Sequence, residues 1–182
     1  MFYEKEIYPS LPIIINFRKN NRSLRRNSDI NMYKKIFQNY KNNLKYKFII
    51  ICNKEEIIEE FRDFKNVYFS KDYFNTIEYD LGLIKSSFLS FFPDSGMSVF
   101  GYFSNTPFIQ FGHMNHQKEK SYIPLNKKTY NFLLDYQKVF SEDEKYDLWI
   151  SEFEKMTLYL NEKGINNNQQ NKPTQKNYES YF

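Results

Sequence analysis

Short apolar runs alternate with amphipathic segments along most of the chain. The runs are rich in isoleucine and phenylalanine and are bounded by polar or turn-forming residues. Continuous apolar runs of this length are typical of strands that are buried on both faces of a sheet. They predict five strands, over residues 11–17, 47–52, 66–69, 88–92 and 106–111.

The segments between these runs have helical periodicity. Their apolar positions are Met32, Ile36, Phe37 and Tyr40 in the first, Ile57, Ile58, Phe61 and Phe64 in the second, Ile77, Leu81 and Ile84 in the third, and Val99, Phe100 and Phe103 in the fourth. Each set predicts a helix with one stripe toward a sheet. Strands that alternate with helices imply right-handed crossovers. The predicted class is therefore α/β, with a doubly wound, mostly parallel, five-stranded Rossmann-like sheet.

The pattern changes after Gly112. A polar loop is predicted over residues 113–126 and a helix over residues 127–140. The sequence Ser141-Glu142-Asp143-Glu144 has the spacing of a capping box, so a last helix is expected to begin there. The apolar stripe of that helix is Leu148, Trp149, Phe153, Met156 and Leu160.

The chain of 182 residues has the length of one domain. We divide it into an N-terminal lead (residues 1–10), a Rossmann-like domain with C-terminal helices (residues 11–163), and a tail (residues 164–182). The tail is rich in Asn, Gln and Lys and has no periodic apolar residues before Tyr178, so we expect it to be disordered.

Composition restricts the function classes. Aromatic residues make up 20% of the chain, which predicts a core built largely from Phe, Tyr and Ile. The net charge of +4 comes from intermixed acidic and basic residues, so a mixed solvated surface is expected. Nucleic-acid binding ranks last, because the aromatic residues fall at core positions and no RNA-binding fingerprint occurs.

Cys52 is the single cysteine and lies in an apolar run, which excludes a disulfide framework within the chain and a cysteine metal site. No membrane-spanning window and no signal sequence are found. A soluble, cytoplasmic protein is therefore predicted.

In an open parallel sheet, ligands bind beyond the carboxyl ends of the strands. The most informative turn contains Asp94, Ser95, Gly96 and Met97 and joins the fourth predicted strand to a helix. Its backbone N–H groups could bind a phosphate, with Gly96 allowing close approach. Alternatively, Asp94 or Ser95 only caps the helix and Gly96 only relieves crowding. The turn by itself leaves both interpretations open.

Two further turns belong to the same predicted edge. The loop after the first strand carries Arg18 and Arg22, whose guanidinium groups suit phosphate oxygens, and Arg18 is the better candidate because it is nearest the strand. The alternative is a mobile basic loop. In the turn after the third strand, Ser70 and Tyr73 could frame a base or a ribose, although a simple loop explains them equally well.

The two histidines of the chain give no metal site. His113 and His116 follow the fifth predicted strand, with Glu119 nearby. Their spacing is irregular and no cysteine or second carboxylate cluster accompanies them. They are interpreted as loop histidines, and no metal is expected.

The stretch from Asp80 to Gly112 resembles the nucleotide-sugar-binding C-terminal half of GT-B glycosyltransferases, as in heptosyltransferase-like families. In these, a helix leads to a strand, a D-S/T-G turn with its helix, and a second strand that ends in glycine. The loop over residues 18–29 is similar to the Arg-Arg-x-Asp region of GT-B fucosyltransferases, with different spacing and no preceding His. The resemblance covers residues 11–112 and is motif-specific over residues 80–112. Family members often carry a His one helical turn after the turn glycine, where this chain has Val99 and Phe100.

The resemblance implies a nucleotide-sugar donor for polysaccharide or glycan synthesis, with no cofactor or metal. Asp94, Ser95, Gly96 and Met97 would contact the diphosphate, and Arg18 and Arg22 would stabilise the departing nucleoside diphosphate. The acceptor and the catalytic base come from an N-terminal domain in such enzymes, which residues 1–10 cannot encode. A fragment or a partner chain is therefore expected.

Two other functions are compatible with an α/β domain. The alternative to a transferase is a non-catalytic nucleotide or nucleotide-sugar binding module. A receiver-type phosphoacceptor domain is disfavoured, because Asn16 and Phe17 stand where that class needs an acidic pair.

Overall fold

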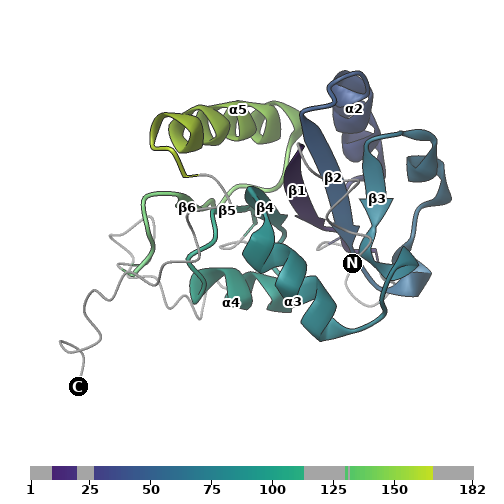
Figure 1. The fold of residues 1–182 in the computed structure, drawn as a ribbon, viewed down its shortest axis with the longest axis horizontal. Coiled ribbons are helices and arrows are strands. Elements are labelled where there is room, and N and C mark those ends of the chain that lie inside the picture. Colours follow the sequence, from purple (N-terminus) through teal and green to yellow (C-terminus); the bar gives the residue numbers. More distant parts are fainter. Residues whose placement is uncertain (1–9, 20–26, 113–129, 131, 166–182) are drawn as a thin grey trace.

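One parallel sheet organises the protein (Figure 1). The computed structural model describes residues 10–19, 27–112, 130 and 132–165. Within them, six strands pair in the order β3-β2-β1-β4-β5-β6, and every pairing is parallel. The strands are β1 (Leu11–Asn16), β2 (Tyr46–Ile51), β3 (Val67–Phe69), β4 (Leu89–Phe92), β5 (Phe108–Gln110) and β6 (Gln137–Val139). The predicted α/β, doubly wound class is confirmed, with one strand more than expected.

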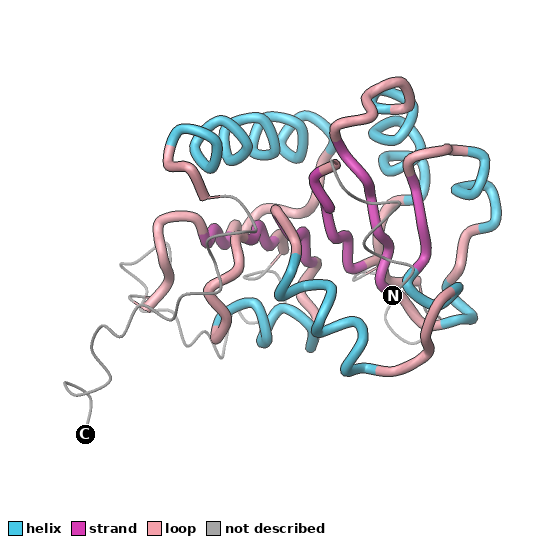
Figure 2. The backbone as a smooth tube through the Cα atoms, in the orientation of Figure 1, coloured by secondary structure: helices cyan, strands magenta, loops and turns pink. Residues whose placement is uncertain are grey.

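Helices cover both faces of this sheet. Helices α2 (Ile30–Tyr40) and α5 (Tyr146–Glu162) lie on one face, and α3 (Ile77–Ser86) and α4 (Gly96–Tyr102) lie on the other (Figures 1 and 2). Helix α3 joins β3 to β4 and so crosses to the face opposite α2. The direction of winding therefore reverses between β1 and β4, which are neighbours in the sheet.

Strand β1 lies at the centre because its isoleucines are matched on both sides. Ile13 pairs in register with Phe48 of β2 and Leu89 of β4, and all three side chains are fully buried. Ile13 and Ile15 face the core under α2 and α5, whereas Ile14 faces α3 and α4. Burial of each such side chain contributes about 1.5–3 kcal/mol. The alternation explains why the strand is apolar at every central position.

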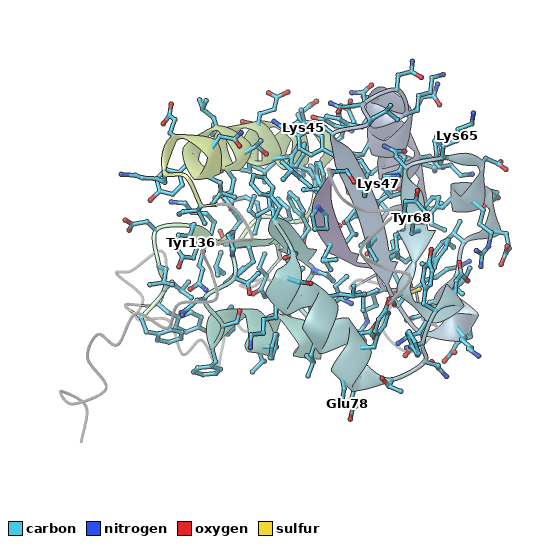
Figure 3. All side chains as sticks on the ribbon, viewed as in Figure 1. Lys45, Lys47, Lys65, Tyr68, Glu78 and Tyr136 are labelled. Atoms are coloured by element: carbon cyan, nitrogen blue, oxygen red, sulfur yellow. The ribbon has the colours of Figure 1, made fainter. Side chains whose placement is uncertain are left out.

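Side chains fill the space between the helices and the sheet (Figure 3). The larger core cluster is rich in Phe, Tyr and Ile, as the composition predicts. Trp149 of α5 stacks on Phe91 of β4 with ring centroids 4.1 Å apart. Phe153, one turn later, makes an edge contact with Tyr46 at 5.1 Å. The predicted stripe of α5 is confirmed, since Trp149, Phe153, Met156 and Leu160 are all buried.

The prediction of a helix over residues 127–140 is wrong in the part that the structure describes. Gln137–Val139 form β6, which pairs with β5. The buried Gln137 amide donates to the carbonyl oxygens of Ser104 at 2.6 Å and Gly101 at 3.3 Å, which anchors the strand. The spacing of aromatic residues around β6 imitates a helical stripe. Residues 113–129 and 131 lie outside the described residues, and these include the predicted polar loop.

Two other predicted elements differ. The capping box at Ser141 is not formed, because α5 begins at Tyr146 and the Ser141 hydroxyl donates to Glu142. The apolar residues around Phe61 form 3-10 turns, η2 (Lys54–Glu56) and η3 (Glu59–Asp63), in place of an α-helix. Phe61 is nevertheless buried against the sheet, so its predicted role in the core is confirmed.

Helices α3 and α4 bury only part of the stripes predicted for them. Ile84 is fully buried and Phe100 packs against the core, as predicted. Val99 and Phe103 are 50% and 80% exposed, and Ile77 of α3 is 53% exposed. Helix α4 instead turns its small residues, Ser98 and Gly101, toward the sheet. A Cβ atom at Gly101 would lie 2.9 Å from a ring carbon of Phe92, so bulky strand residues require the glycine.

Helix α5 ends in a Schellman motif. The Ile165 N–H donates to the Leu160 carbonyl at 3.0 Å, and Gly164 takes a left-handed φ of 63°. Ile165 is partly buried against the core, so the contacts of this end of α5 continue past residue 163. Residues 166–182 lie outside the described residues. Within the described residues, no helix is long and apolar enough to cross a membrane.

A polar contact joins α2 to the segment before α5. The hydroxyl of Tyr33, which is fully buried in α2, donates to the carboxylate of Glu144 in the segment before α5. Burial raises the pKa of Glu144 from 4.5 to about 7, the hydrogen bond from Tyr33 opposes this, and the nearby charge of Asp29 adds to it. The folded protein therefore binds a proton at this carboxyl more tightly than the unfolded chain does.

This contact predicts how stability depends on pH. Because the folded-state pKa of Glu144 is raised, its contribution is full below about pH 4.5 and is lost as the pH rises through about 7. Glu144→Gln keeps an acceptor for Tyr33 and cannot ionise. The variant should be more stable than the parent at pH 8 by about 1–3 kcal/mol and no more stable at pH 4.5. Urea unfolding at both values measures this, with exposed Glu142→Gln as control, and equal gains at both values would contradict it.

Candidate functional site

A pocket of about 330 Å³ lies at the carboxyl edge of the sheet, where the winding reverses. In doubly wound sheets this is the position at which ligands bind. Its wall comes from four parts of the chain. These are the end of β1 (Asn16, Phe17, Arg18), the end of β2 with η2 (Ile51, Cys52, Asn53, Glu56), helix α3 (Ile77, Asp80) and the β4–α4 turn (Ser95, Met97).

The fold brings together three of the predicted phosphate-site residues. Arg18, Ser95 and Met97 line the same pocket, although they come from distant parts of the sequence. Asp94 and Gly96 belong to the same turn but are not part of the lining. Arg22, the second predicted arginine, lies outside the described residues.

The predicted base or ribose residues lie beside the pocket and do not line it. Ser70 is fully buried directly after β3, and its hydroxyl has no hydrogen-bond partner among the described residues. Tyr73 is 46% exposed. Their assignment to a base or ribose stays a prediction. His113, His116 and Glu119 lie outside the described residues.

Hydrogen bonds join three strand ends at the pocket. The Ser95 hydroxyl donates to Asn16 Oδ1 at 2.6 Å, and Asn16 Nδ2 donates to the Ile51 carbonyl at 3.2 Å. Ser95 occupies the N-cap position of α4 but makes no capping hydrogen bond. The capping alternative therefore does not account for Ser95, whose hydroxyl is directed to β1.

Hydrogen bonds to Ser28 hold the backbone of Arg18 at the start of the loop that follows β1. Its backbone N–H donates to the Ser28 hydroxyl at 3.2 Å, and its carbonyl accepts from the Ser28 N–H at 2.8 Å. These bonds fix the two ends of the loop that leaves β1. The guanidinium Nε is buried and has no hydrogen-bond partner among the described residues. Arg18 is therefore anchored through its backbone, and its side chain retains a donor for a ligand.

Asp80 is a pocket residue that the sequence pattern did not single out. This residue is only 4% exposed and lines the pocket. Its Oδ2 forms a buried ion pair with Lys71, whereas its Oδ1 has no partner among the described residues. Asp80 lies three residues after Ile77 on α3, close to the predicted apolar stripe. A carboxylate so near a core-facing stripe was the signal that could have identified it.

Glu56 was also missed. Its carboxylate accepts from the Lys19 N–H at 3.0 Å, the Asn53 N–H at 3.0 Å and Asn53 Nδ2 at 2.9 Å. The side chain thereby joins the end of β1, directly after Arg18, to the end of β2. The spacing Asn53-x-x-Glu56 is that of a capping box, which was the available signal in the sequence.

Cys52 lines the pocket as a buried thiol. Burial, together with the negative charge of Glu56, raises the pKa of its thiol to about 12. Because the thiolate is the reactive form, the thiol contributes an apolar wall to the pocket.

The pocket combines one unpaired cationic donor with buried carboxylates. Arg18 suits an anion, and Asp80 suits a ligand N–H or O–H group. No group of three or more His, Cys, Asp or Glu side chains among the described residues could hold a metal ion. At the neighbouring α2, the Asp29 carboxylate caps the helix by accepting from the N–H groups of Asn31 and Met32 at 2.9 and 3.2 Å.

No protein-family model, no curated protein and no solved structure matched the chain. The Rossmann-like α/β assignment rests on the order and direction of the strands, and the comparisons add nothing to it.

The three hydrogen bonds of Glu56, called the clamp here, predict that replacing Glu56 lowers the free energy of unfolding more than replacing the adjacent Glu55. Glu56→Ala removes three charge-assisted hydrogen bonds and should lower the free energy of unfolding by about 2–4 kcal/mol. Glu55→Ala removes an exposed side chain from the same turn and should change it by less than about 0.5 kcal/mol. Urea denaturation of both variants measures the difference. Equal values would contradict the clamp.

Proposed function

We propose that the pocket binds a nucleotide-sugar, with the diphosphate between Arg18 and the Ser95–Met97 turn, and that the chain is the donor-binding half of a GT-B-like glycosyltransferase. The single observation that carries the proposal is the pocket itself. It lies at the reversal of winding and joins Arg18 to Ser95 and Met97.

Arg18 supports the phosphate part of the proposal. A buried guanidinium N–H without a partner costs free energy that a phosphate oxygen would recover. Forked hydrogen bonds from a guanidinium group match the geometry of phosphate oxygens. In a glycosyl transfer, the same contacts would stabilise the nucleoside diphosphate as it departs.

Asp80 is the evidence that the pocket also contacts the polar, uncharged part of the ligand. A carboxylate accepts hydrogen bonds and repels phosphate, so Asp80 is suited to N–H or O–H groups of the base, ribose or sugar. Its unpartnered Oδ1 is the acceptor that such a group would satisfy. The pocket thus offers a donor for the phosphates and an acceptor for the remainder of a nucleotide-sugar.

The size of the pocket supports the assignment to half of an enzyme. Its volume of about 330 Å³ is near the lower end of the range for ligand pockets, roughly 300–1,000 Å³. A nucleotide-sugar would extend beyond it and would need a second wall. In GT-B enzymes, which the sequence resembles, an acceptor domain provides that wall.

A non-catalytic binding module is the second candidate, and one observation favours it. Each carboxylate that lines the pocket already has a partner, since Glu56 holds three donors and Asp80 pairs with Lys71. Glu56 is therefore committed to structural hydrogen bonds, and at Asp80 only Oδ1 is left to contact a ligand. If the protein binds a nucleotide-sugar but neither transfers the sugar to an acceptor nor hydrolyses the donor, this candidate is favoured.

A thermal-shift screen with GDP-, UDP-, ADP- and CMP-sugars tests the proposal. A ligand that binds only the folded state stabilises it by about 2.7 kcal/mol at one hundred times its Kd, which raises the melting temperature. At least one of the four should do so. The absence of a shift with all four at millimolar concentration would contradict nucleotide-sugar binding.

Arg18→Ala should weaken binding of the selected nucleotide-sugar by about 1.5–3 kcal/mol, because one charge-assisted contact is lost. Lys19→Ala is the matched control, since Lys19 is exposed and uses its backbone N–H, not its side chain, to bond Glu56. Isothermal titration calorimetry measures both affinities. Equal effects would show that Arg18 acts only through net charge.

Gly96→Val should abolish binding of the same ligand while the fold survives. A Cβ atom at Gly96 meets nothing within 4 Å, so only an approaching ligand would collide with the added side chain. Gly82→Val on α3 is the control, because that glycine is equally unobstructed and lies outside the β4–α4 turn. Unchanged affinity in a folded Gly96 variant, established by circular dichroism and calorimetry, would remove this turn from the site.

A further inference from the structure

The short turn after β3, residues Ser70–Asp72, is called the platform here. Its Lys71 forms the one buried ion pair found among the described residues. Lys71 lies in the 3-10 turn η4 (Ser70–Asp72) and pairs through Nζ with Asp80 of α3. The two side chains are only 7% and 5% exposed. Lys71 is not part of the pocket lining, whereas Asp80 is. The ammonium therefore lies behind the carboxylate as seen from the pocket.

The platform is fixed on its other side as well. Asp72, the next residue, accepts a forked pair from Arg62 at 2.6 and 2.9 Å, and Arg62 also bonds Glu59 at 2.7 Å. The N–H groups of Tyr73 and Phe74 both donate to the Ser70 carbonyl. Lys71 thus projects from a turn whose backbone and flanks are already held.

A buried carboxylate with an unpartnered oxygen needs a neighbouring cation to balance its charge and fix its orientation. Glu56 and Cys52, from the end of β2, line the same pocket and offer Asp80 no positive charge. Arg18 lines it from the end of β1, and no bond between Arg18 and Asp80 is formed. Arg62, another cation near the platform, is already ion-paired with Asp72. Lys71 is the cation that pairs with Asp80. Its ammonium group contacts Asp80 Oδ2, and Asp80 Oδ1 has no partner among the described residues.

We infer that Lys71 is a positioning residue of the pocket: it holds Asp80 so that the remaining carboxylate oxygen can accept an N–H or O–H group of the nucleoside or sugar part of the ligand. This inference rests on the proposed function. Lys71 would therefore affect recognition of the nucleoside and would not affect binding of the phosphates. A lysine near a diphosphate site would ordinarily be expected to bind the phosphates.

Two probes separate these roles. GDP, UDP and ADP carry both a nucleoside and a diphosphate, whereas inorganic pyrophosphate carries only the phosphates. Lys71→Met should weaken binding of the best nucleoside diphosphate about tenfold or more, the value of one hydrogen bond to a charged group. Its affinity for pyrophosphate should change no more than that of Lys65→Met. Lys65 is the charge-matched control, because it is exposed and lies just before β3.

A second comparison remains valid if the uncompensated Asp80 prevents Lys71→Met from folding. The double variant Lys71→Met/Asp80→Asn removes both buried charges together, which proteins tolerate better than the loss of one. Because Lys71 acts through Asp80, the double variant should bind the nucleoside diphosphate as well as Asp80→Asn alone does, within about twofold.

Several results would overturn the inference. A drop in pyrophosphate affinity beyond that of Lys65→Met would mean that Lys71 acts on the phosphates. Nucleoside diphosphate affinity equal to that of Lys65→Met, or a double variant tenfold weaker than Asp80→Asn, would mean that Lys71 does not act through Asp80. A parent protein that binds neither probe would contradict the proposed function itself, and the inference would fall with it.

Discussion

The structure depends on the parallel pairing of β1 with a neighbour on each side. A strand with parallel partners on both edges cannot be reached by hairpins, so each connection must cross the sheet. The isoleucines of β1 point alternately to both faces and are fully buried, which requires helices on both faces. Crossovers of one hand can cover both faces only if the direction of winding changes. That change occurs beside β1 and places the pocket there.

The interior and the pocket are held together by different interactions. Between the helices and the sheet, apolar and aromatic contacts dominate, such as Trp149 on Phe91. At the carboxyl edge, polar side chains bond to one another across strand ends, as Asn16 does with Ser95 and Glu56 does with Lys19. Hydrogen bonds are directional and these are partly buried, so they fix the relative positions of the strand ends. The lining is thereby organised before a ligand arrives.

The strands were predictable because each one is a continuous apolar run flanked by polar residues. Strand β6 was not, since three residues with an exposed lysine at the centre give no periodic signal. In a chain this rich in aromatic residues, apolar spacing also suggests helices where none forms, as around Phe61 and Phe140. The face of α4 was misjudged for a related reason. Its contact with Phe92 and Phe108 requires small residues, so the apolar Val99 and Phe103 turn outward.

The candidate site was predictable only where it depended on topology. Arg18, Ser95 and Met97 follow the ends of β1 and β4, and parallel strands bring such positions to one edge. Asp80 and Glu56 are set by side-chain partners. Nothing in the sequence indicates that Lys71 reaches Asp80 from another element, or that Glu56 bonds a backbone amide at Lys19. Propensity and periodicity describe single elements and carry no information on such pairs.

The cap of α2 has a consequence for the direction from which an anion can enter. In dinucleotide-binding sheets, the helix after the first strand offers its bare amides to a pyrophosphate, and a glycine-rich turn makes room for it. Here Asp29 supplies a resident carboxylate to those amides. A phosphate arriving at the same place would have to displace a covalently tethered anion and would meet its charge at close range. The Asp29 side chain therefore occupies the amides at the start of α2 and leaves the β4 side of the pocket as the open approach for an anion.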